Sequence, residues 1–307
     1  MIITKTTLRK FEAEDYMRIL DFLKETYRKT GSLDNWLIDR WNFVRYFSQT
    51  MCETYESWPS TIGIWEDENG EITAVVNSEG ENSGEAFFQL STYDVSEKFL
   101  IELFDYAERN LSQKLDGCTK IRLRIKRDNV VIERLARERG YKPLDWYETF
   151  TKMPLTGCFP VELPKGFQIR NGSELNAEMQ GIAHTKAFGY IGTDRAKITP
   201  DCYRALRNAP DYRAELDFAV VDMEGEVASF CTIWLDTTNG ICILEPVGTI
   251  PKYRKMGLGR AVIYHGFNTA AQMGAHTGFV CNDLPFYLRI GMKPVGIHVV
   301  WEKAWEE

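Results

Sequence analysis

The sequence lacks the features that mark membrane-spanning, exported or metal-binding proteins. No stretch approaches the roughly 18 apolar residues of a membrane-spanning helix, and the N-terminus has no hydrophobic signal region. The seven cysteines include no Cys-x-x-Cys pair, and the four histidines show no metal-ligand spacing. We therefore expect a cytoplasmic protein with reduced thiols, no membrane partner and no metal.

An excess of basic residues is also missing. The formal net charge is −7, and most of it lies in the first half, because residues 151–307 hold 16 of the 37 basic and 17 of the 44 acidic residues. An acidic protein is poorly suited to the phosphate backbone of nucleic acids, so we expect no nucleic-acid partner. The acidic surface either steers a cationic amine or is only solvated, and the sequence leaves both interpretations open.

The most informative segment is residues 241–260, with the sequence ICILEPVGTIPKYRKMGLGR. It predicts an apolar strand, a turn, and a helix that begins at Gly257-Leu258-Gly259. The glycines leave backbone N–H groups uncovered at the helix end where an anion is favoured, and Arg254 and Lys255 add positive charge. The motif of a P-loop is absent, and the spacing is not that of a Rossmann fingerprint. The segment therefore predicts a site for a phosphate or diphosphate.

The residues after this segment follow a defined order. Apolar residues keep helical spacing over residues 257–273, and a short strand is expected over His276–Cys281. Asn282 comes next, and Tyr287 stands four residues before Gly291. The chain thus has five features in a fixed order: a strand, a glycine-rich helix start, a second strand, an Asn and a Tyr-x-x-x-Gly segment.

This order, with Arg-x-x-Gly-x-Gly at residues 254–259, resembles the acyl-CoA-binding part of the GNAT acetyltransferase superfamily. Met292 departs mildly from the pattern, because Phe is more usual after this glycine. The resemblance implies an α/β fold in which a mixed, mainly antiparallel sheet is flanked by helices. It also implies acetyl-CoA as the acyl donor, with no metal.

The rest of the C-terminal half fits the same plan. Ser173 is expected to cap a helix that runs to about Phe188, and Pro200 to stand at the first position of the next helix. Further strands are expected over Phe167–Arg170, Leu216–Asp222 and Glu226–Asp236, with hairpin turns at 223–225 and 236–240, and a strand through His298–Trp301 is expected to close the sheet.

The chain also contains an internal repeat. The string Gly140-Tyr-Lys-Pro143 is a near twin of Gly291-Met-Lys-Pro294, and Asn129 precedes the first much as Asn282 precedes the second. A repeat of about 150 residues indicates a domain duplication. We expect two GNAT-like domains, at residues 1–154 and 167–307 with a linker over 155–166, in a tandem arrangement that resembles mycothiol synthase.

The two copies are not equivalent. Where the first copy should carry its phosphate loop, residues 87–99 contain no glycine pair and no basic pair, and Ser96 predicts an ordinary helix cap. Asp94 and Glu97 would repel a diphosphate, and Ala136 stands where the second copy has Tyr287. We therefore expect a degenerate N-terminal domain and a catalytic C-terminal domain that binds acetyl-CoA.

The resemblance assigns residues to acetyl-CoA. Backbone groups at 247–249 would pair with the pantetheine arm, and one N–H among them would polarise the thioester carbonyl. Amides of 256–260, with the two basic side chains before them, would hold the diphosphate. Asn282 would contact CoA, cap the following helix, or both. The expected set is Val247, Gly248, Thr249, Arg254, Lys255, Met256, Gly257, Leu258, Gly259, Arg260 and Asn282.

Two residues are expected to manage protons. Tyr287 is the expected acid for the departing thiolate, the alternative being a ring that hydrogen-bonds CoA without donating a proton. Glu245, within an apolar run, is the expected base; it would otherwise bind the acceptor ammonium or cap a turn, and a water chain is a rival base. Alternation puts Ile243, Glu245 and Val247 on one face, unless a bulge at Pro246 shifts them.

The resemblance implies direct acetyl transfer from acetyl-CoA to an amine, and we expect the acceptor to be a primary amine of a small molecule. Nothing in the sequence indicates an oligomer, and none is excluded. Two alternatives remain open. A protein or peptide N-acetyltransferase would need an open groove for its substrate. A non-catalytic acyl-CoA sensor or scaffold would need the phosphate loop but not the tyrosine.

Overall fold

The computed structural model describes residues 6–80, 84–115 and 117–306. The chain forms two compact units, and these do not coincide with its two halves. Unit 1 comprises Met1–Leu37, Thr54–Phe150 and Pro294–Glu307, and unit 2 comprises Ile38–Glu53 and Thr151–Lys293. A segment of the N-terminal half therefore belongs to unit 2, and the last strand of the chain belongs mainly to unit 1.

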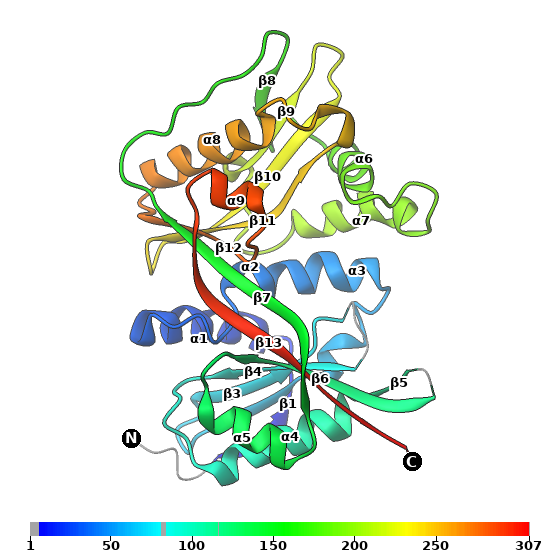
Figure 1. Cartoon of the computed structure of the whole chain (residues 1–307), viewed down its shortest axis with the longest axis vertical. Coiled ribbons are helices and arrows are strands. Elements are labelled where there is room, and N and C mark those ends of the chain that lie inside the picture. The colour runs from blue at the N-terminus through cyan, green and yellow to red at the C-terminus, as the bar shows by residue number, and fades with distance from the viewer. Residues whose placement is uncertain (1–5, 81–83, 116, 307) are drawn as a thin grey trace. The chain divides into compact units, whose positions relative to one another are not determined.

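Unit 1 is a mixed sheet flanked by helices (Figure 1). Its strands follow the order β1-β2-β3-β4-β6-β13; β4 and β6 run parallel, and the other pairings described within this order are antiparallel. Its elements are β1 (Thr7–Lys10), α1 (Asp15–Thr30), the 3-10 helix η2 (Trp58–Thr61), β2 (Gly63–Glu66), β3 (Ile72–Asn77), β4 (Glu85–Leu90), α4 (Glu97–Asn110), β5 (Gln113–Leu115), β6 (Cys118–Lys126), α5 (Val130–Glu138), β7 (Lys142–Pro154, as far as Phe150) and β13 (Lys293–Trp305, from Pro294).

Unit 2 repeats this plan (Figure 1). Its strands follow the order β8-β9-β10-β11-β12-β7, in which β11 and β12 run parallel and the other described pairings are antiparallel. Its elements are α2 (Ile38–Phe43), a π-helical segment η1 (Val44–Ser48), α3 (Gln49–Met51), the end of β7, β8 (Gln168–Asn171), α6 (Ala177–Phe188), α7 (Arg195–Leu206), η3 (Ala214–Leu216), β9 (Asp217–Val221), β10 (Val227–Asp236), β11 (Ile241–Thr249), η4 (Pro251–Tyr253), α8 (Leu258–Gln272), β12 (Thr277–Val280) and α9 (Pro285–Arg289). The predicted class, mixed and mainly antiparallel sheets flanked by helices, is confirmed.

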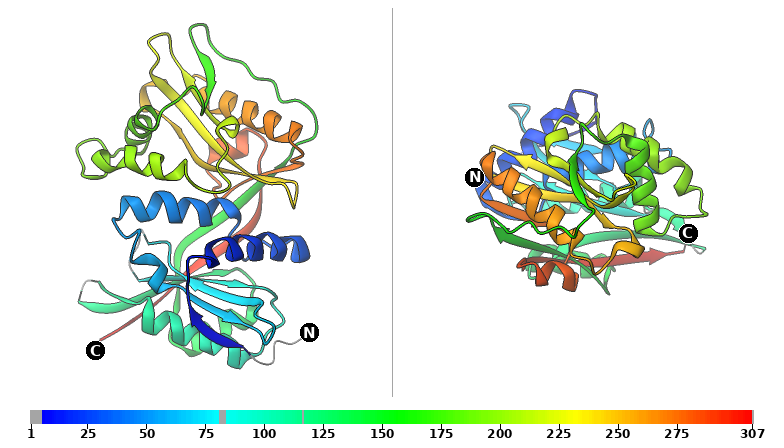
Figure 2. Two further views of the ribbon diagram at one scale, coloured as in Figure 1. Left: turned by 180° about the vertical axis from the view of Figure 1, so that it is seen from behind. Right: turned by 90° about the horizontal axis from the view of Figure 1, so that it is seen from above.

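The sheet of unit 2 is covered on both faces, and each face has its own apolar cluster. The larger cluster includes Val262 and Phe267 of α8 together with Leu244 of β11. The smaller cluster joins Ala183 of α6 to Phe230 of β10. Figure 2, with its view from behind, shows α6 and α7 on the face away from α8. Because β10 is buried along its whole length, its sequence is almost continuously apolar rather than alternating.

Two predicted helix starts are wrong. Asn176, not Ser173, caps α6, because its Oδ1 accepts a hydrogen bond from the N–H of Met179 at 2.8 Å, while residues 171–174 form a turn before it. Helix α7 begins at Arg195, so Pro200 lies inside it rather than at its start. The extra turn forms through hydrogen bonds three residues apart at its N-terminus, which the missing N–H of the proline does not interrupt.

The last strand of the chain is correctly predicted, but its partner is not. We expected the strand through His298–Trp301 to close the sheet of the C-terminal half, and this is wrong. In β13, residues 298–305 pair with β6 of unit 1. The end of β7, Thr151–Pro154, pairs instead with β12 of unit 2. The edge of β12 is therefore satisfied by a strand from the first copy of the repeat.

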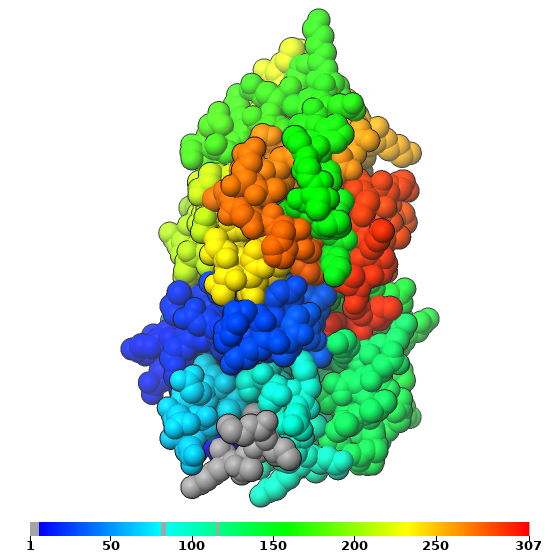
Figure 3. Space-filling model, turned by 90° about the vertical axis from the view of Figure 1, so that its left-hand side faces the viewer, coloured from blue at the N-terminus to red at the C-terminus, as the bar shows by residue number. Residues whose placement is uncertain are grey.

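The expected linker, residues 155–166, is irregular but does not extend freely from unit 2. Phe159 forms two backbone hydrogen bonds with the side chain of Asn268 in α8, at 2.8 and 2.9 Å, and its ring stacks on Tyr264. Figure 3 shows this green segment lying against the orange helix α8. These contacts place the start of the C-terminal half along α8.

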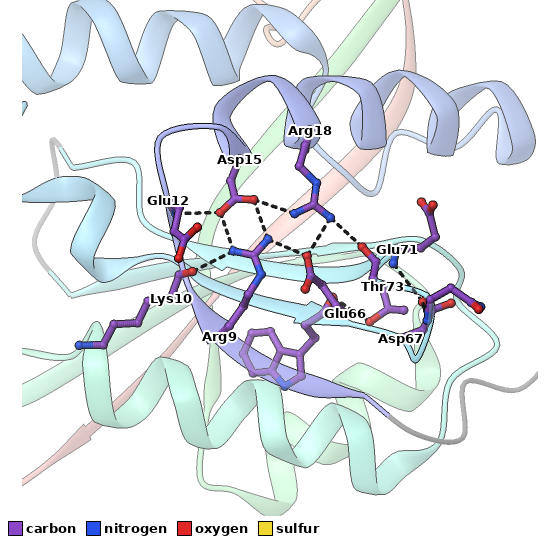
Figure 4. Close-up of polar contacts among 12 residues, drawn as sticks. Arg9, Lys10, Glu12, Asp15, Arg18, Glu66, Asp67, Glu71 and Thr73 are labelled. Atoms are coloured by element: carbon purple, nitrogen blue, oxygen red, sulfur yellow. Dashed lines mark hydrogen bonds and ion pairs between the residues drawn. The ribbon is translucent and has the colours of Figure 1, made fainter.

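A cluster of charged residues in unit 1 joins β1, β2 and the start of α1 (Figure 4). Arg9 donates to both carboxylate oxygens of Asp15 at 2.6 Å and to Glu66 at 2.6 Å, and Arg18 bridges the same two acids. Burial alone would raise the pKa of Asp15, but hydrogen bonds from Arg9 and from the N–H of Glu12 outweigh it, so the pKa is lowered. The same arginines lower the pKa of Glu66. The folded state thus favours both carboxylates in ionised form.

We expect Asp15→Asn to lower the free energy of unfolding by about 2–3 kcal/mol at neutral pH, since it weakens hydrogen bonds between charged groups. Because the folded pKa of Asp15 is lowered, its stabilisation is present above about pH 4 and is lost as the pH falls below that value. The variant should therefore lose less stability than the wild type on acidification. Urea denaturation at neutral pH and at about pH 3 measures both effects.

Glu25→Gln is the control, because it breaks an exposed ion pair with Arg28 on the same helix. It should leave the urea midpoint almost unchanged. Equal losses from the two variants at neutral pH would contradict the prediction.

Candidate active site

The parallel pairing of β11 with β12 is short. It is described for Ile241 with Thr277, Cys242 with Gly278 and Ile243 with Phe279, whereas β11 runs on beside β10 as far as Thr249. Past Ile243, no pairing of β11 with β12 is described. The backbone of its last residues therefore offers an edge to which an extended group could bind.

β11 also contains a bulge. Cys231 of β10 pairs with Val247, and Ile233 pairs with Leu244, so β11 has one extra residue at positions 245–246. As a result, Leu244 and Val247 both pack in the cluster on the α8 side of the sheet. The predicted alternation that put Ile243 and Val247 on one face is therefore interrupted, as a bulge at Pro246 would require.

The segment after β11 forms a turn, here called the anion-binding turn (residues 254–260), whose backbone is suited to an anion. Gly257 is the N-cap residue of α8 and has a left-handed backbone, with φ +83°. Lys255, two residues earlier, is also left-handed, with φ +66°. Left-handed residues at such spacing are found in turns whose successive backbone N–H groups can bind an anion. The first hydrogen bond of α8 in the backbone runs from Ala261 to Gly257, so the N–H groups of residues 258–260 precede the helical ladder.

Gly259 allows this turn to pack closely. A Cβ atom there would lie 3.1 Å from Thr249 Oγ1 and 3.2 Å from the Phe286 ring. Thr249 Oγ1 in turn lies 2.9 Å from Ser229 Oγ, which donates to the carbonyl of Gly248 at 3.0 Å. The start of α8, the end of β11 and α9 are thus held together around the turn.

These elements enclose a cleft of about 1110 Å³. It is lined by every predicted cofactor-binding residue at 247–249 and 254–260, and by Tyr287. Its charged lining residues among those described are Arg254, Lys255, Arg260 and Arg289, with no carboxylate. The cleft is therefore suited to an anionic ligand with an extended, partly apolar body.

Tyr287 lies in α9 with its side chain largely buried, at 7% exposure. Burial raises the pKa of its hydroxyl above the ordinary value, and the electrostatic effects of Cys231 and Glu245 raise it further. The phenol is therefore protonated over the whole physiological pH range and can donate a hydrogen bond or a proton.

Glu245 is half-buried at the bulge and is not among the residues that line the cleft. Its backbone carbonyl accepts a hydrogen bond from Trp234 Nε1 at 2.7 Å, which fixes the main chain at the bulge. Its negative charge contributes to the raised pKa of both Tyr287 and Tyr203. The carboxylate thus lies within electrostatic range of the tyrosine predicted as the acid.

Three other predicted site residues have definite partners within the protein. The Oδ1 of Asn282 accepts the N–H of Leu284 at 2.9 Å and so closes a turn just before α9, whose N-cap residue is Leu284, without a side-chain cap. The Arg254 guanidinium donates to backbone carbonyls, and Arg260 pairs with the exposed Glu162 at 3.3 Å. Asn282 does not line the cleft.

Several residues at the site have no local signal in the sequence. Phe188, at the end of α6, lines the cleft and stacks on His184 with ring centroids 4.2 Å apart. His184 is buried, and its Nδ1 lies 3.2 Å from the hydroxyl of Tyr203. Burial lowers the pKa of His184 to about 3, so the imidazole stays neutral. Phe47, from the N-terminal half, packs against both His184 and Tyr203.

The corresponding region of unit 1 is closed. β4 and β6 also pair over only a short stretch, at Glu85 with Arg122 and Ala86 with Leu123. The pocket beside them measures only about 30 Å³. The predicted cap is confirmed, since Ser96 Oγ accepts the N–H of Phe99 at the start of α4, where unit 2 has its open turn.

Within the described ranges, no group of three or more His, Cys, Asp or Glu residues could hold a metal ion. In the same part of the chain, no helix is both long and apolar enough to cross a membrane.

Comparison with family models gives a match within the C-terminal half. Residues 190–292 match the model of the acetyltransferase (GNAT) family. No curated protein matches the sequence.

Solved structures share the fold over nearly the whole chain. A GCN5-related N-acetyltransferase from Sphaerobacter thermophilus is 14% identical, with a TM-score of 0.63 over 97% of this chain and 95% of that one. A tandem GNAT protein from the clavulanic acid biosynthesis pathway is 12% identical, with a TM-score of 0.67 over 98% of both chains. N-myristoyltransferase of Saccharomyces cerevisiae is 10% identical, with a TM-score of 0.55 over 99% of this chain and 79% of that one.

At these identities the solved structures show the fold alone. Residues 190–292 form a domain that matches the acetyltransferase (GNAT) family, whose members transfer an acyl group from acyl-CoA, and the chain as a whole has the fold of tandem GNAT proteins.

Proposed function

We propose that this protein transfers an acetyl group from acetyl-CoA directly to a primary amine of a small molecule, and that the transfer takes place in the cleft of unit 2. The observation that carries the proposal is that the anion-binding turn, the open edge of β11 and Tyr287 border one cleft of about 1110 Å³. The seven cysteines are free thiols, which agrees with a reaction in the cytoplasm.

The residues present fit acetyl-CoA. The N–H groups at the start of α8, with Lys255 and Arg260 beside them, supply donors and positive charge for a diphosphate. Val247, Gly248 and Thr249 supply the open strand edge for the pantetheine arm. Asn282 supports the site by holding the start of α9, which presents Tyr287.

Acetyl-CoA, when bound, supplies the acetyl group as a thioester with a good leaving group. An N–H group at residues 247–249 would polarise the thioester carbonyl. Tyr287 would hold a proton for the leaving sulfur, because its raised pKa keeps it protonated. Glu245 would take the proton of the acceptor amine, directly or through water, from its position at the bulge.

We further propose that unit 1 is degenerate and binds no acyl-CoA. Its pocket of about 30 Å³ has room for little more than a water molecule, and the Ser96 side chain occupies the helix start that would bind a diphosphate. In this proposal, acetyl-CoA binds once per chain, in the C-terminal domain over residues 167–307.

Replacing Gly257 tests the binding site. Gly257→Glu strains a left-handed position and puts a negative charge at the anion-binding turn, so calorimetric binding of acetyl-CoA should be lost. The wild type should bind one acetyl-CoA per chain. Gly274→Glu is the matched control, because Gly274 has φ +101° with open space around it at the other end of α8. Two sites in the wild type, or equal affinity in all three proteins, would overturn the proposal.

Removing one hydroxyl tests the chemistry. We expect Tyr287→Phe to lower kcat by about 10²- to 10⁴-fold, the usual contribution of a general acid, while acetyl-CoA binding is kept. Because burial raises the pKa of Tyr287, its ionisation should cause no fall in wild-type kcat up to about pH 10. Steady-state rates with an amine found by screening measure both effects.

Tyr264→Phe is the control for this substitution. It also removes a tyrosine hydroxyl, one that donates to the carbonyl of Ile290 at 3.1 Å beyond α9, but Tyr264 does not line the cleft. An unchanged kcat in Tyr287→Phe would exclude the acid role. Wild-type binding of acetyl-CoA without turnover on any amine would favour a sensor.

A further inference from the structure

We propose that Arg254 is a positioning residue that links the anion-binding turn to the last turn of α6. Through this link, binding of acyl-CoA would order the end of α6, which forms the side of the cleft where the acceptor docks. The proposal rests on acyl-CoA binding in unit 2. It gives Arg254 a role beyond that of a positive charge beside the diphosphate.

The hydrogen bonds of Arg254 support this role. Its Nε donates to the carbonyl of Thr249 at 3.1 Å, and its Nη2 donates to the carbonyl of Ala187 at 3.0 Å. Thr249 is the last residue of β11, and Ala187 lies in the last turn of α6. The carbonyls of that turn have no partners further along the helix and carry the negative end of its dipole, which favours a cation. The planar guanidinium can bridge the carbonyls of Ala187 and Thr249, which a lysine ammonium does less well.

A second polar connection reaches the same turn of α6. Lys186 donates to Glu226 Oε1 at 2.6 Å, and Lys252, two residues before Arg254, pairs with the other oxygen of the same carboxylate. The hydroxyl of Tyr253 donates to Glu226 Oε2 at 3.0 Å. Residues 252–254 are therefore tied to the end of α6 both through Glu226 and through Arg254.

The end of α6 forms part of the cleft. Ala187 and Phe188 line it on the side away from α8. The helix lies directly against β11, since a Cβ atom at Gly248 would be 3.1 Å from the Cβ of Ala187 and 2.4 Å from the Phe230 ring. Phe188 is 46% exposed, so its ring forms a wall of the cleft that depends on where α6 ends.

These contacts connect two parts of the reaction. The anion-binding turn includes Lys255 in a left-handed conformation, directly after Arg254. An anion that restrains the backbone of this turn also restrains the position of Arg254. Arg254 in turn restrains the end of α6 through its hydrogen bond to the carbonyl of Ala187. Because coupling between two bound ligands is reciprocal, an acceptor that contacts Phe188 should bind more tightly after acyl-CoA than before it.

Hydrogen exchange with and without saturating CoA tests the link without a known acceptor. In the wild type, CoA should slow amide exchange in a peptide at 255–262, at the turn, and by about fivefold or more in one at 184–190, at the end of α6. Arg254→Lys keeps the charge but loses the two-carbonyl bridge. It should keep the CoA-dependent protection at 255–262 and lose that at 184–190.

Lys255→Gln is the matched control, because it removes the neighbouring charge and leaves the bridge intact. It should weaken CoA binding, yet at saturation both peptides should be protected as in the wild type. Arg254→Gln serves as a second variant, and thermal midpoints of all proteins check that each is folded. Since the comparison is between the free and CoA-bound forms of each protein, a general loosening of α6 does not imitate the result.

The outcomes separate this proposal from the proposed function. If CoA protects neither peptide in the wild type, the assignment of the cofactor site fails. If CoA protects 255–262 but not 184–190 in the wild type, or if both Arg254 variants keep protection at 184–190, the link fails while the cofactor site stands.

Discussion

The early end of the parallel pairing between β11 and β12 is the constraint on which the candidate site depends. A parallel pair must be joined by a crossover, and here α8 provides it. The chain leaves β11 at Thr249 and enters α8 at Leu258, so the positive end of the helix dipole lies next to the free edge of the strand. One arrangement of backbone therefore offers both an anion site and a strand edge to the same extended ligand.

Unit 1 shows that this backbone arrangement is not sufficient. Its β4 and β6 also pair briefly around a crossover through α4, but the pocket beside them measures only about 30 Å³. The carboxamide of Asn35 makes two hydrogen bonds with the backbone of Leu90 at the end of β4, at 2.8 and 2.9 Å. Ser96 supplies the helix cap. In unit 1, side chains satisfy backbone groups at the end of β4 and the start of α4. In unit 2, the corresponding backbone groups at the end of β11 and the start of α8 face the cleft.

Unit 2, which contains the cleft, is also more than the C-terminal half of the chain. Residues 38–53 belong to unit 2, where Asn42 donates to Asp211 at 3.0 Å and Phe47 packs on the His184–Tyr203 pair. His184 is neutral and lies behind Phe188, so this aromatic group sets the shape of one wall rather than its charge. Three of the four cationic residues that line the cleft, Arg254, Lys255 and Arg260, lie instead at the anion-binding turn. The cleft thus combines a basic end with an apolar one.

The sequence by itself determined the glycine-rich turn at 254–259, the position of Tyr287 before Gly291, the repeat and the cap at Ser96. Each of these is a local property, because glycine spacing, capping chemistry and short apolar runs act within a few residues. The tertiary structure decided the strand pairings of β7 and β13, the bulge at 245–246 and the place of residues 38–53. It also gave Arg254 its partner at Ala187, 67 residues away. Such pairings depend on which distant backbone groups remain unsatisfied once the sheet has formed, and no local pattern encodes that.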